Sequence, residues 1–241
     1  MKRAFRNLFR RLVGLSPHFG HTTISREQML WLAMEYVAAS QRAGDYAEFG
    51  VWRGDTIATA YRYTRNNRLL EGMRFFAFDS FEGFPELKAD DVHSQFRTGG
   101  RAFSLQQFHS HIQKIGVPEG SVTAVPGWFS ASLAPGQDAD RLVPDASLAV
   151  AWVDCDLYES TRDALPFVFR KLRPGGLVIF DDWYCFEGHP MKGEQRAVRE
   201  LLEADPTVVL VPFHRFGWHG TSFIFHHSDD PIPGGRGIAA C

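Results

Sequence analysis

Two pairs of aspartates follow apolar runs that predict buried strands. Asp154 and Asp156 come after LAVAWV, and Asp181 and Asp182 come after GGLVIF. Carboxylates placed close together raise one another's pKa, and a divalent cation removes that cost. Since the carboxyl ends of parallel strands meet at one edge of a sheet, Asp154, Asp181 and Asp182 are candidates for binding a metal ion.

A second group of residues surrounds a glycine turn. Glu48, Gly50 and Gly54 stand in EFGVWRG, where glycine allows a sharp turn and a close approach of the backbone to a ligand. The E-x-G-x-x-x-G spacing disfavours the dinucleotide fingerprint G-x-G-x-x-G. Asp79 ends the next predicted strand, where a carboxylate can accept both hydrogen bonds of a ribose diol. Together they favour a ligand with a nucleoside, although an ordinary turn and a capping aspartate have the same pattern.

The elements that must position these residues alternate between strand and helix. Ser25 and Gln28 form a capping box, which predicts a helix from Ser25 to about Gly44. Strands are predicted within residues 46–50, 73–79, 121–129, 147–156, 175–183, 207–213 and 220–227. The alternation indicates a doubly wound α/β sheet, whose ligands lie beyond the carboxyl ends of the strands.

The composition limits the kinds of partner and the cellular location that we expect for this protein. The 241 residues, 44% of them hydrophobic, suffice for one large core, and 26 lysines and arginines against 28 acids give a net charge of −2. We therefore expect no nucleic-acid partner. Three cysteines without disulfide or zinc spacing favour a reducing, cytoplasmic location. No run approaches the roughly 20 apolar residues of a membrane span.

Residues 1–15, MKRAFRNLFRRLVGL, differ from the nearly balanced charge of the whole chain, because they contain basic residues and no acid. Their apolar residues recur at helical spacing, which predicts a basic amphipathic helix. Such a helix could make weak peripheral contact with an anionic membrane. Alternatively, its apolar stripe docks on the same chain or on a second subunit in a homodimer, which we favour. The expected division is a basic extension at 1–24, one catalytic domain at 25–228 and a loose tail at 229–241.

Five motifs carry a resemblance. EFGVWRGDT, FDSFEGFPE, PGWF, VDCDLYEST and GGLVIFDDW resemble, in order and spacing, the macrocin O-methyltransferase family over about residues 25–226. The resemblance implies a class I methyltransferase with a Rossmann-like, mostly parallel sheet and one antiparallel strand near the C-terminus. Such enzymes methylate sugar hydroxyls of macrolide and aminocoumarin antibiotics with S-adenosylmethionine and Mg²⁺.

The resemblance also implies roles for individual residues. Those expected to bind S-adenosylmethionine are Glu48, Gly50, Gly54, Asp79, Ser80, Gly127, Trp128, Phe129 and Asp154, with Asp79 at the ribose and Gly127 to Phe129 near the adenine. Those expected to hold the metal are Asp154, Asp181 and Asp182. The chemistry agrees, because Mg²⁺ prefers oxygen ligands and often keeps water that a substrate oxygen can replace.

The expected reaction begins with an acceptor hydroxyl, which is a poor nucleophile while protonated. A cation lowers its pKa and aligns it for attack on the sulfonium methyl group. Asp154 is the first candidate for the general base and His189 the second. Relatives that methylate catechols have a lysine where this chain has Leu157, which disfavours a lysine base. Asp156 is expected to orient the loop or to cap the following helix.

Three alternatives remain open at this stage. A dehydrogenase is disfavoured by the glycine spacing, whereas a catechol-type O-methyltransferase and a noncatalytic, methyltransferase-like binding or scaffold protein both fit the fold. The predicted acceptor is a small molecule with a hydroxyl group, a sugar or a glycosylated compound. Its identity is expected to depend on the loops at 85–104 and 183–194.

Overall fold

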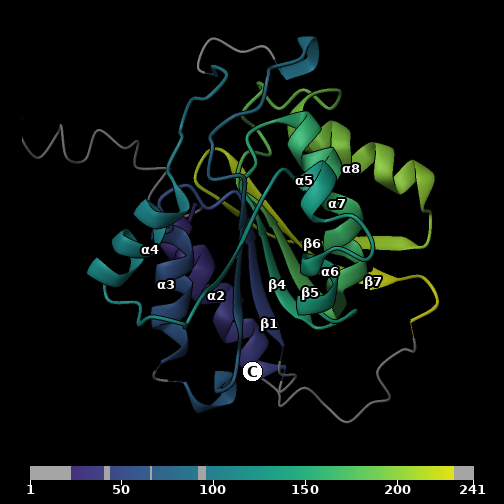
Figure 1. The fold of residues 1–241 in the computed structure, drawn as a ribbon. Coiled ribbons are helices and arrows are strands. Elements are labelled where there is room, and N and C mark those ends of the chain that lie inside the picture. Colours follow the sequence, from purple (N-terminus) through teal and green to yellow (C-terminus); the bar gives the residue numbers. More distant parts are fainter. Residues whose placement is uncertain (1–22, 41–43, 66, 92–95, 231–241) are drawn as a thin grey trace, which may run out of the picture.

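The computed structural model describes residues 23–40, 44–65, 67–91 and 96–230. Helices cover both faces of one central sheet (Figure 1). The strands are β1 (Asp45–Phe49), β2 (Phe75–Asp79), β3 (Thr123–Pro126), β4 (Leu148–Val153), β5 (Leu172–Phe180), β6 (Val208–Phe216) and β7 (Gly220–His227). The helices are α2 (Arg26–Ala39), α3 (Asp55–Thr64), α4 (Leu105–Lys114), α5 (Phe129–Ser132), α6 (Asp138–Leu142), α7 (Tyr158–Lys171) and α8 (Gly193–Ala204), with short 3-10 helices η1 (Arg68–Leu70) and η2 (Ala89–Asp91).

The sheet has the strand order β3-β2-β1-β4-β5-β7-β6. Strands β1 to β5 pair in parallel, and β7 pairs antiparallel with both β5 and β6. This confirms the predicted mostly parallel sheet with one antiparallel strand near the C-terminus. The order reverses beside β1, which lies between β2 and β4, so the crevice at the carboxyl ends of β1 and β4 is the expected ligand site.

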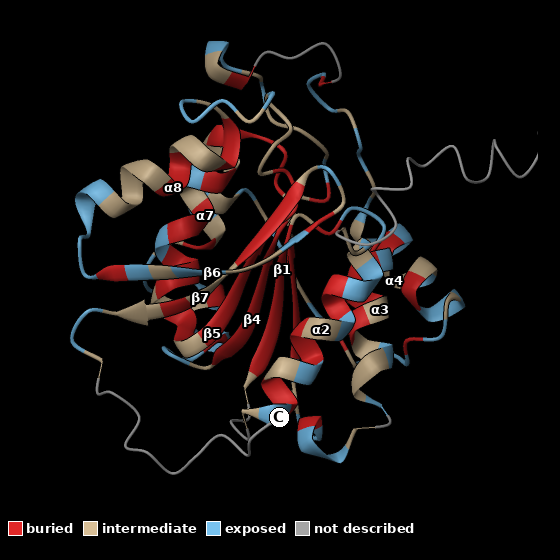
Figure 2. Cartoon of the chain, turned by 180° about the vertical axis from the view of Figure 1, so that it is seen from behind, coloured by how far each residue is buried: buried red, intermediate tan, exposed pale blue. Residues whose placement is uncertain are grey.

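Two apolar layers enclose the sheet, one on each face. All residues of β1 and β4 are buried (Figure 2). Successive side chains point to opposite faces, so Trp152 packs in the layer beneath α2 and α3, whereas Val153 packs in the layer beneath α7. A continuous apolar run such as LAVAWV is therefore what a parallel strand covered on both faces requires.

The first described helix confirms the predicted start but is shorter than expected. The Ser25 hydroxyl accepts from the backbone N–H of Gln28, and the Gln28 side chain accepts from that of Ser25. The helix ends at Ala39 instead of continuing to about Gly44. Beyond its end, the Ser40 hydroxyl donates to the carbonyl of Val37 at 2.7 Å, a local bond that competes with continued helix.

Helix α7 begins with a cap that comes from a distant loop. Asp91, 1% exposed, accepts the backbone N–H groups of Tyr158 at 2.6 Å and Glu159 at 3.2 Å. A carboxylate satisfies two free N–H groups there and favours the positive end of the helix dipole. The expectation that Asp156 could cap this helix is therefore wrong, since Asp91 occupies that role.

The N-terminal prediction lies mostly outside the described residues. Of the expected extension only residues 23 and 24 are described, and the carbonyl of Ile24 accepts from the N–H of Gly217 at 2.8 Å. The amphipathic helix at 1–15 and most of the tail stay predictions. Within the described ranges, no helix combines the length and apolar character needed to cross a membrane.

The turn from β1 to α3 brings the first strand into contact with the fourth. Gly50 has a φ of 86°, and a Cβ there would fall on the carbonyl oxygen of Asp154. Gly54, also at 86°, faces the side chains of Phe108 and Ile112 on α4. The first glycine therefore allows β1 and β4 to end together, and the second allows α3 and α4 to pack closely.

We predict that Gly50→Ala destabilises the protein more than Gly72→Ala. Both glycines have a φ near 85°, but a Cβ at Gly72 would have nothing within 4 Å. The control should lose about 1 kcal/mol from backbone strain alone, and Gly50→Ala roughly 1–3 kcal/mol more from steric overlap. Urea denaturation measures both, and equal losses would contradict the contact with Asp154.

Candidate active site

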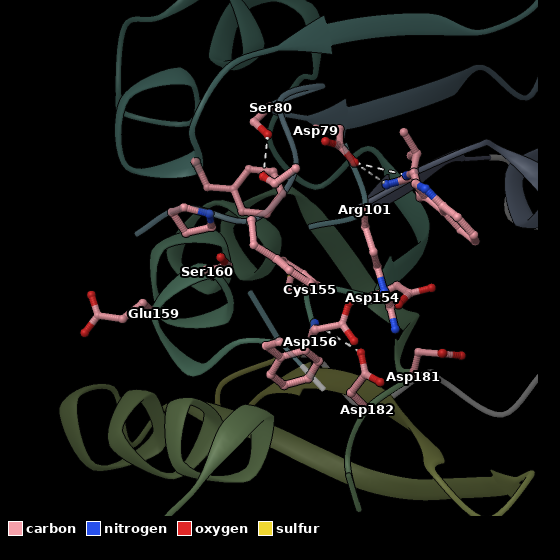
Figure 3. Close-up of a pocket in the computed structure, with 18 of the residues that line it drawn as sticks. Asp79, Ser80, Arg101, Asp154, Cys155, Asp156, Glu159, Ser160, Asp181 and Asp182 are labelled. Atoms are coloured by element: carbon pink, nitrogen blue, oxygen red, sulfur yellow. Dashed lines mark hydrogen bonds and ion pairs between the residues drawn. The ribbon is translucent and has the colours of Figure 1, made fainter. Parts of the chain in front are cut away.

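One cavity of about 770 Å³ lies at the carboxyl ends of the central strands. Most of the residues predicted to form the site line it: Glu48, Gly50, Asp79, Ser80, Gly127, Trp128, Phe129, Asp154, Asp181 and Asp182. In Figure 3, Asp79 and Ser80 lie at one end and the aspartates that follow β4 and β5 lie at the other. The volume suits a small-molecule site.

Asp79 fixes the glycine turn at its end of the cavity. One carboxylate oxygen accepts from the backbone N–H groups of Val51 at 2.9 Å and Trp52 at 3.1 Å, and the other accepts from that of Phe81 at 2.8 Å. The Asp79 carbonyl also accepts from the N–H of Gly127 at 2.9 Å. The end of β2 thus joins the turns that follow β1 and β3 around one opening.

Three acids meet beyond β4 and β5. Asp154, Asp156 and Asp182 each offer an oxygen, and these oxygens lie within 4.8 Å of one another. A φ of 59° at Asp156 turns the backbone there, so that its N–H donates to Asp182 at 3.1 Å. Asp156, expected to have a structural role, is therefore part of the carboxylate group itself.

Asp181 lies next to this group but faces an arginine from the first described helix. The Arg26 guanidinium donates to Asp181 and lies 3.6 Å from Asp154, so one cation bridges the ends of β4 and β5. The Asp181 side chain is 2% exposed, and its Oδ1 has no hydrogen-bond partner among the described residues. A buried carboxylate oxygen without a partner is costly, so this atom is available to a further donor or ligand.

The pKa values of Asp154, Asp156 and Asp181 are raised above the usual range of an aspartate. Burial raises the pKa of Asp154 to about 7, the charge of Asp182 adds to this, and Arg26 opposes it. Burial is also the main cause that raises the pKa values of Asp156 and Asp181, with neighbouring aspartates adding to it. Without a bound cation, proton uptake is how this cluster reduces its own repulsion.

Several residues around the cluster were not predicted. Glu194 at the start of α8 is 1% exposed and accepts the backbone N–H of Asp182 at 3.0 Å. Arg101 pairs with Asp156 at 2.7 Å, and the His219 Nδ1 is hydrogen-bonded to the Asp181 carbonyl at 2.6 Å. Like Arg26, Arg101 and His219 come from segments remote in sequence from their partners, whereas Glu194 follows Asp182 by only 12 residues. No local motif marks these three residues.

Two predicted site residues lie elsewhere. His189 is exposed and outside the cavity lining, and its Nδ1 accepts from the N–H of Met191 at 3.1 Å. Gly54 also does not line the cavity; it begins α3 and packs against α4. The structure thus brings Asp154, but not His189, to the carboxylate cluster.

The sequence model of the family described as Macrocin-O-methyltransferase (TylF) matches residues 1–205. The chain belongs to the macrocin O-methyltransferase family. It is an S-adenosylmethionine-dependent O-methyltransferase. The match covers the glycine turn, Asp79, the three converging aspartates and Asp181, whereas Trp218 and His219 of the cavity lining lie beyond it.

The chain is also similar to curated relatives and to solved structures, which agree with this family assignment. It is 36% identical over 212 residues to 8-demethyl-8-(2,3-dimethoxy-alpha-L-rhamnosyl)-tetracenomycin-C 4'-O-methyltransferase of Streptomyces olivaceus, covering 83% of this chain and 78% of the relative. It is 28% identical over 204 residues to mycinamicin III 3''-O-methyltransferase of Micromonospora griseorubida, covering 78% and 77%. The O-methyltransferase NovP superposes with a TM-score of 0.61 at 26% identity, covering 83% and 78%.

We predict that the cation-free methyltransferase loses stability as the pH rises toward 7. The pKa of Asp154 is about 7 in the folded protein against 3.8 as its ordinary value, so the folded state binds the extra proton between these values. That preference contributes stability at the acid end of the window and is lost as pH rises through it. Asp156 and Asp181 act in the same direction.

Thermal unfolding in EDTA between about pH 5 and about pH 8 measures this effect. Asp154→Asn should reduce the fall in Tm by at least about 3 °C, the shift that roughly 1 kcal/mol produces in a domain of this size. Asp138→Asn, on an exposed side chain, is the control. Parallel curves for wild type and Asp154→Asn would show that Asp154 carries no raised pKa.

Proposed function

We propose that this enzyme transfers a methyl group from S-adenosylmethionine to a hydroxyl of a sugar or a glycosylated small molecule, and that it does so with a divalent cation. The relatives named above methylate glycosylated compounds, which supports the acceptor class. The observation that carries the metal dependence is the carboxylate cluster, which shares one cavity with the glycine turn and Asp79.

The donor would lie along the edge formed by β1 and β2. Asp79, with Ser80 beside it, would accept the ribose hydroxyls, because each carboxylate oxygen can accept more than one hydrogen bond. Gly127, Trp128 and Phe129 line the same end, and Trp128 is 38% exposed, which leaves its ring available to the adenine. The bare turn at Gly50 allows the rest of the donor to approach the backbone.

The acidic residues fit a divalent cation. Asp154, Asp181 and Asp182 would hold it, as hard oxygen ligands do, and the partnerless Oδ1 of Asp181 is an available ligand atom. Arg26 contacts Asp154 and the other oxygen of Asp181, Oδ2, so it leaves Oδ1 free. When bound, the cation would lower the pKa of the acceptor hydroxyl and orient it toward the donor.

Asp154 is the proposed general base. Its side chain is 16% exposed, against 2% for Asp181, so it is the more accessible of these two acids to an acceptor in the cavity. A carboxylate at this position can take the hydroxyl proton as the oxygen attacks the methyl group. The surrounding acids disfavour a net negative charge, which makes the same carboxylate a good proton acceptor.

Acceptor selection would depend on segments that surround the cavity rather than on the sheet. Pro85, Glu86, Lys88, Phe96 and Arg101 of the loop at 85–104 line the opening, which supports its expected role. From the loop at 183–194, Cys185 lines it. Trp218, 68% exposed and at the rim, adds an aromatic surface on which a sugar ring could stack.

We predict that Asp154→Asn lowers kcat at least about 100-fold, the usual effect of removing a general base. Labelled S-adenosylmethionine and a panel of nucleotide sugars and glycosylated metabolites would first identify an acceptor, and initial rates would then compare the variants. Asp138→Asn is again the control. A donor that binds wild type without transfer to any hydroxyl compound would favour a noncatalytic binding protein.

A second prediction concerns the metal ligands. Asp154 and Asp182 are proposed metal ligands, and their oxygens also lie close together in the structure. The third ligand could be Asp181, as proposed, or Asp156, whose oxygen lies close to those two. We expect Asp181→Asn to weaken Mn²⁺ binding by calorimetry at least about tenfold, as lost ligands do, and Asp156→Asn to have the smaller effect. The reverse order would assign the third position to Asp156.

Removal and return of the metal complete this test. EDTA should abolish methyl transfer by the wild type, and Mg²⁺ should restore it. Full activity after chelation would overturn the metal dependence while leaving the methyltransferase assignment in place.

A further inference from the structure

We propose that Arg26 binds the α-carboxylate at the methionine end of S-adenosylmethionine. The inference rests on the proposed donor site and assigns a recognition residue that comes from outside the sequence motifs of that site. It follows from the position of the guanidinium, from its unused donors and from the excess of negative charge around it.

Arg26 is the first residue of α2, and it lines the cavity. One terminal nitrogen donates to Asp181. The other makes only long contacts among the described residues, 3.4 Å to the Thr56 hydroxyl and 3.6 Å to Asp154. A guanidinium has five N–H donors in a planar fork, so it can keep Asp181 and still offer a pair of donors to a carboxylate.

The position agrees with where the methionine end must lie. With the ribose at Asp79 and the transferable methyl facing an acceptor oxygen near Asp154, the amino-acid part extends past the turn between β1 and α3. Thr56 belongs to the first turn of α3, so the guanidinium lies between that turn and the cluster. Arg26 also interacts electrostatically with Glu48, which is buried at the end of β1.

The α-carboxylate of the donor needs a positively charged partner in this part of the cavity. When ionised, Asp154, Asp181 and Glu48 would all repel the α-carboxylate of the donor, whereas they suit its α-ammonium and sulfonium groups. An anion that enters this part of the cavity must therefore be paired, since an unpaired charge away from water is costly. Arg26 is the cation that touches the acids and the start of α3 together.

The other cations that line the cavity are less well placed. Lys88 pairs with Glu159 at 2.7 Å, and Arg101 pairs with Asp156 at 2.7 Å on the side of the loop at 85–104. Arg53 lies 3.7 Å from Asp55, which is itself 59% exposed. Among these contacts, none links the start of α3 at Thr56 to Asp154 or Asp181, as those of Arg26 do.

The test compares two donors by calorimetry in the presence of Mg²⁺: S-adenosylmethionine and decarboxylated S-adenosylmethionine, which lacks only the α-carboxylate. We expect the wild type to bind the complete donor at least about tenfold more tightly, as a charge-assisted pair allows. Arg26→Gln should lose this preference, chiefly through weaker binding of the complete donor. Arg26→Lys should keep part of it, because lysine retains the charge without the fork.

Arg53→Gln is the matched control, since it also removes one positive charge from the cavity lining and should keep the wild-type preference. A preference that survives in Arg26→Gln, or an equal loss of affinity for both donors, overturns the inference. These outcomes are distinct from failure of the proposed function, in which the wild type itself would bind neither donor. Circular dichroism of both glutamine variants verifies folding, and Arg26→Lys keeps the test decisive if Arg26→Gln unfolds.

Discussion

The structure depends on the burial of several carboxylates at one edge of a sheet. Asp154, Asp181 and Asp182 follow two neighbouring parallel strands, and Glu48 is the penultimate residue of the strand beside β4. Such a concentration of negative charge is unfavourable in a low-dielectric interior unless protons or cations compensate it. The raised pKa values of Asp154 and Asp181 and the pairing of both residues with Arg26 are two responses to this one constraint, and the proposed divalent cation would be a third.

The backbone around the cluster is built to tolerate this charge. N–H groups are directed at carboxylates repeatedly: Asp79 receives them from the glycine turn, Asp182 from Asp156, and Glu194 from Asp182. These bonds leave little freedom for the turns between them, so the cluster is held in a fixed arrangement. Preorganised polar groups of this kind bind an ion or a reacting group without first having to rearrange.

The proposed donor and cation sites lie at the edge of the sheet, and the proposed acceptor site lies among the loops around the cavity. The sheet edge holds the residues proposed for donor and cation, and these come from strand ends with little freedom to move. Described residues of the loop at 85–104, Trp218 and helix α2, which carries Arg26, also line the cavity. Asp91 ties that loop to α7, so the part of the cavity proposed for the acceptor is anchored to the core at a helix terminus.

Much of this organisation could be predicted because its signals are local. The capping box at Ser25, the apolar run before Asp154 and the acids at strand ends are all contained in a few consecutive residues. Strand alternation with helices then fixed the fold class, since parallel strands need helical crossovers. The end of α2 and the cap of α7 were predicted less well, because a serine bond and a remote aspartate determine them.

The sequence by itself determined the class of sheet, the strand ends that carry acids, and the family to which the chain belongs. Only the tertiary structure decided which charges meet: that Arg26 bridges Asp154 and Asp181, that Asp156 joins the cluster, and that His189 stays outside it. The physical reason is range. Periodicity and capping act over one or two turns of chain, whereas the partners of a buried charge are chosen by packing between segments more than a hundred residues apart.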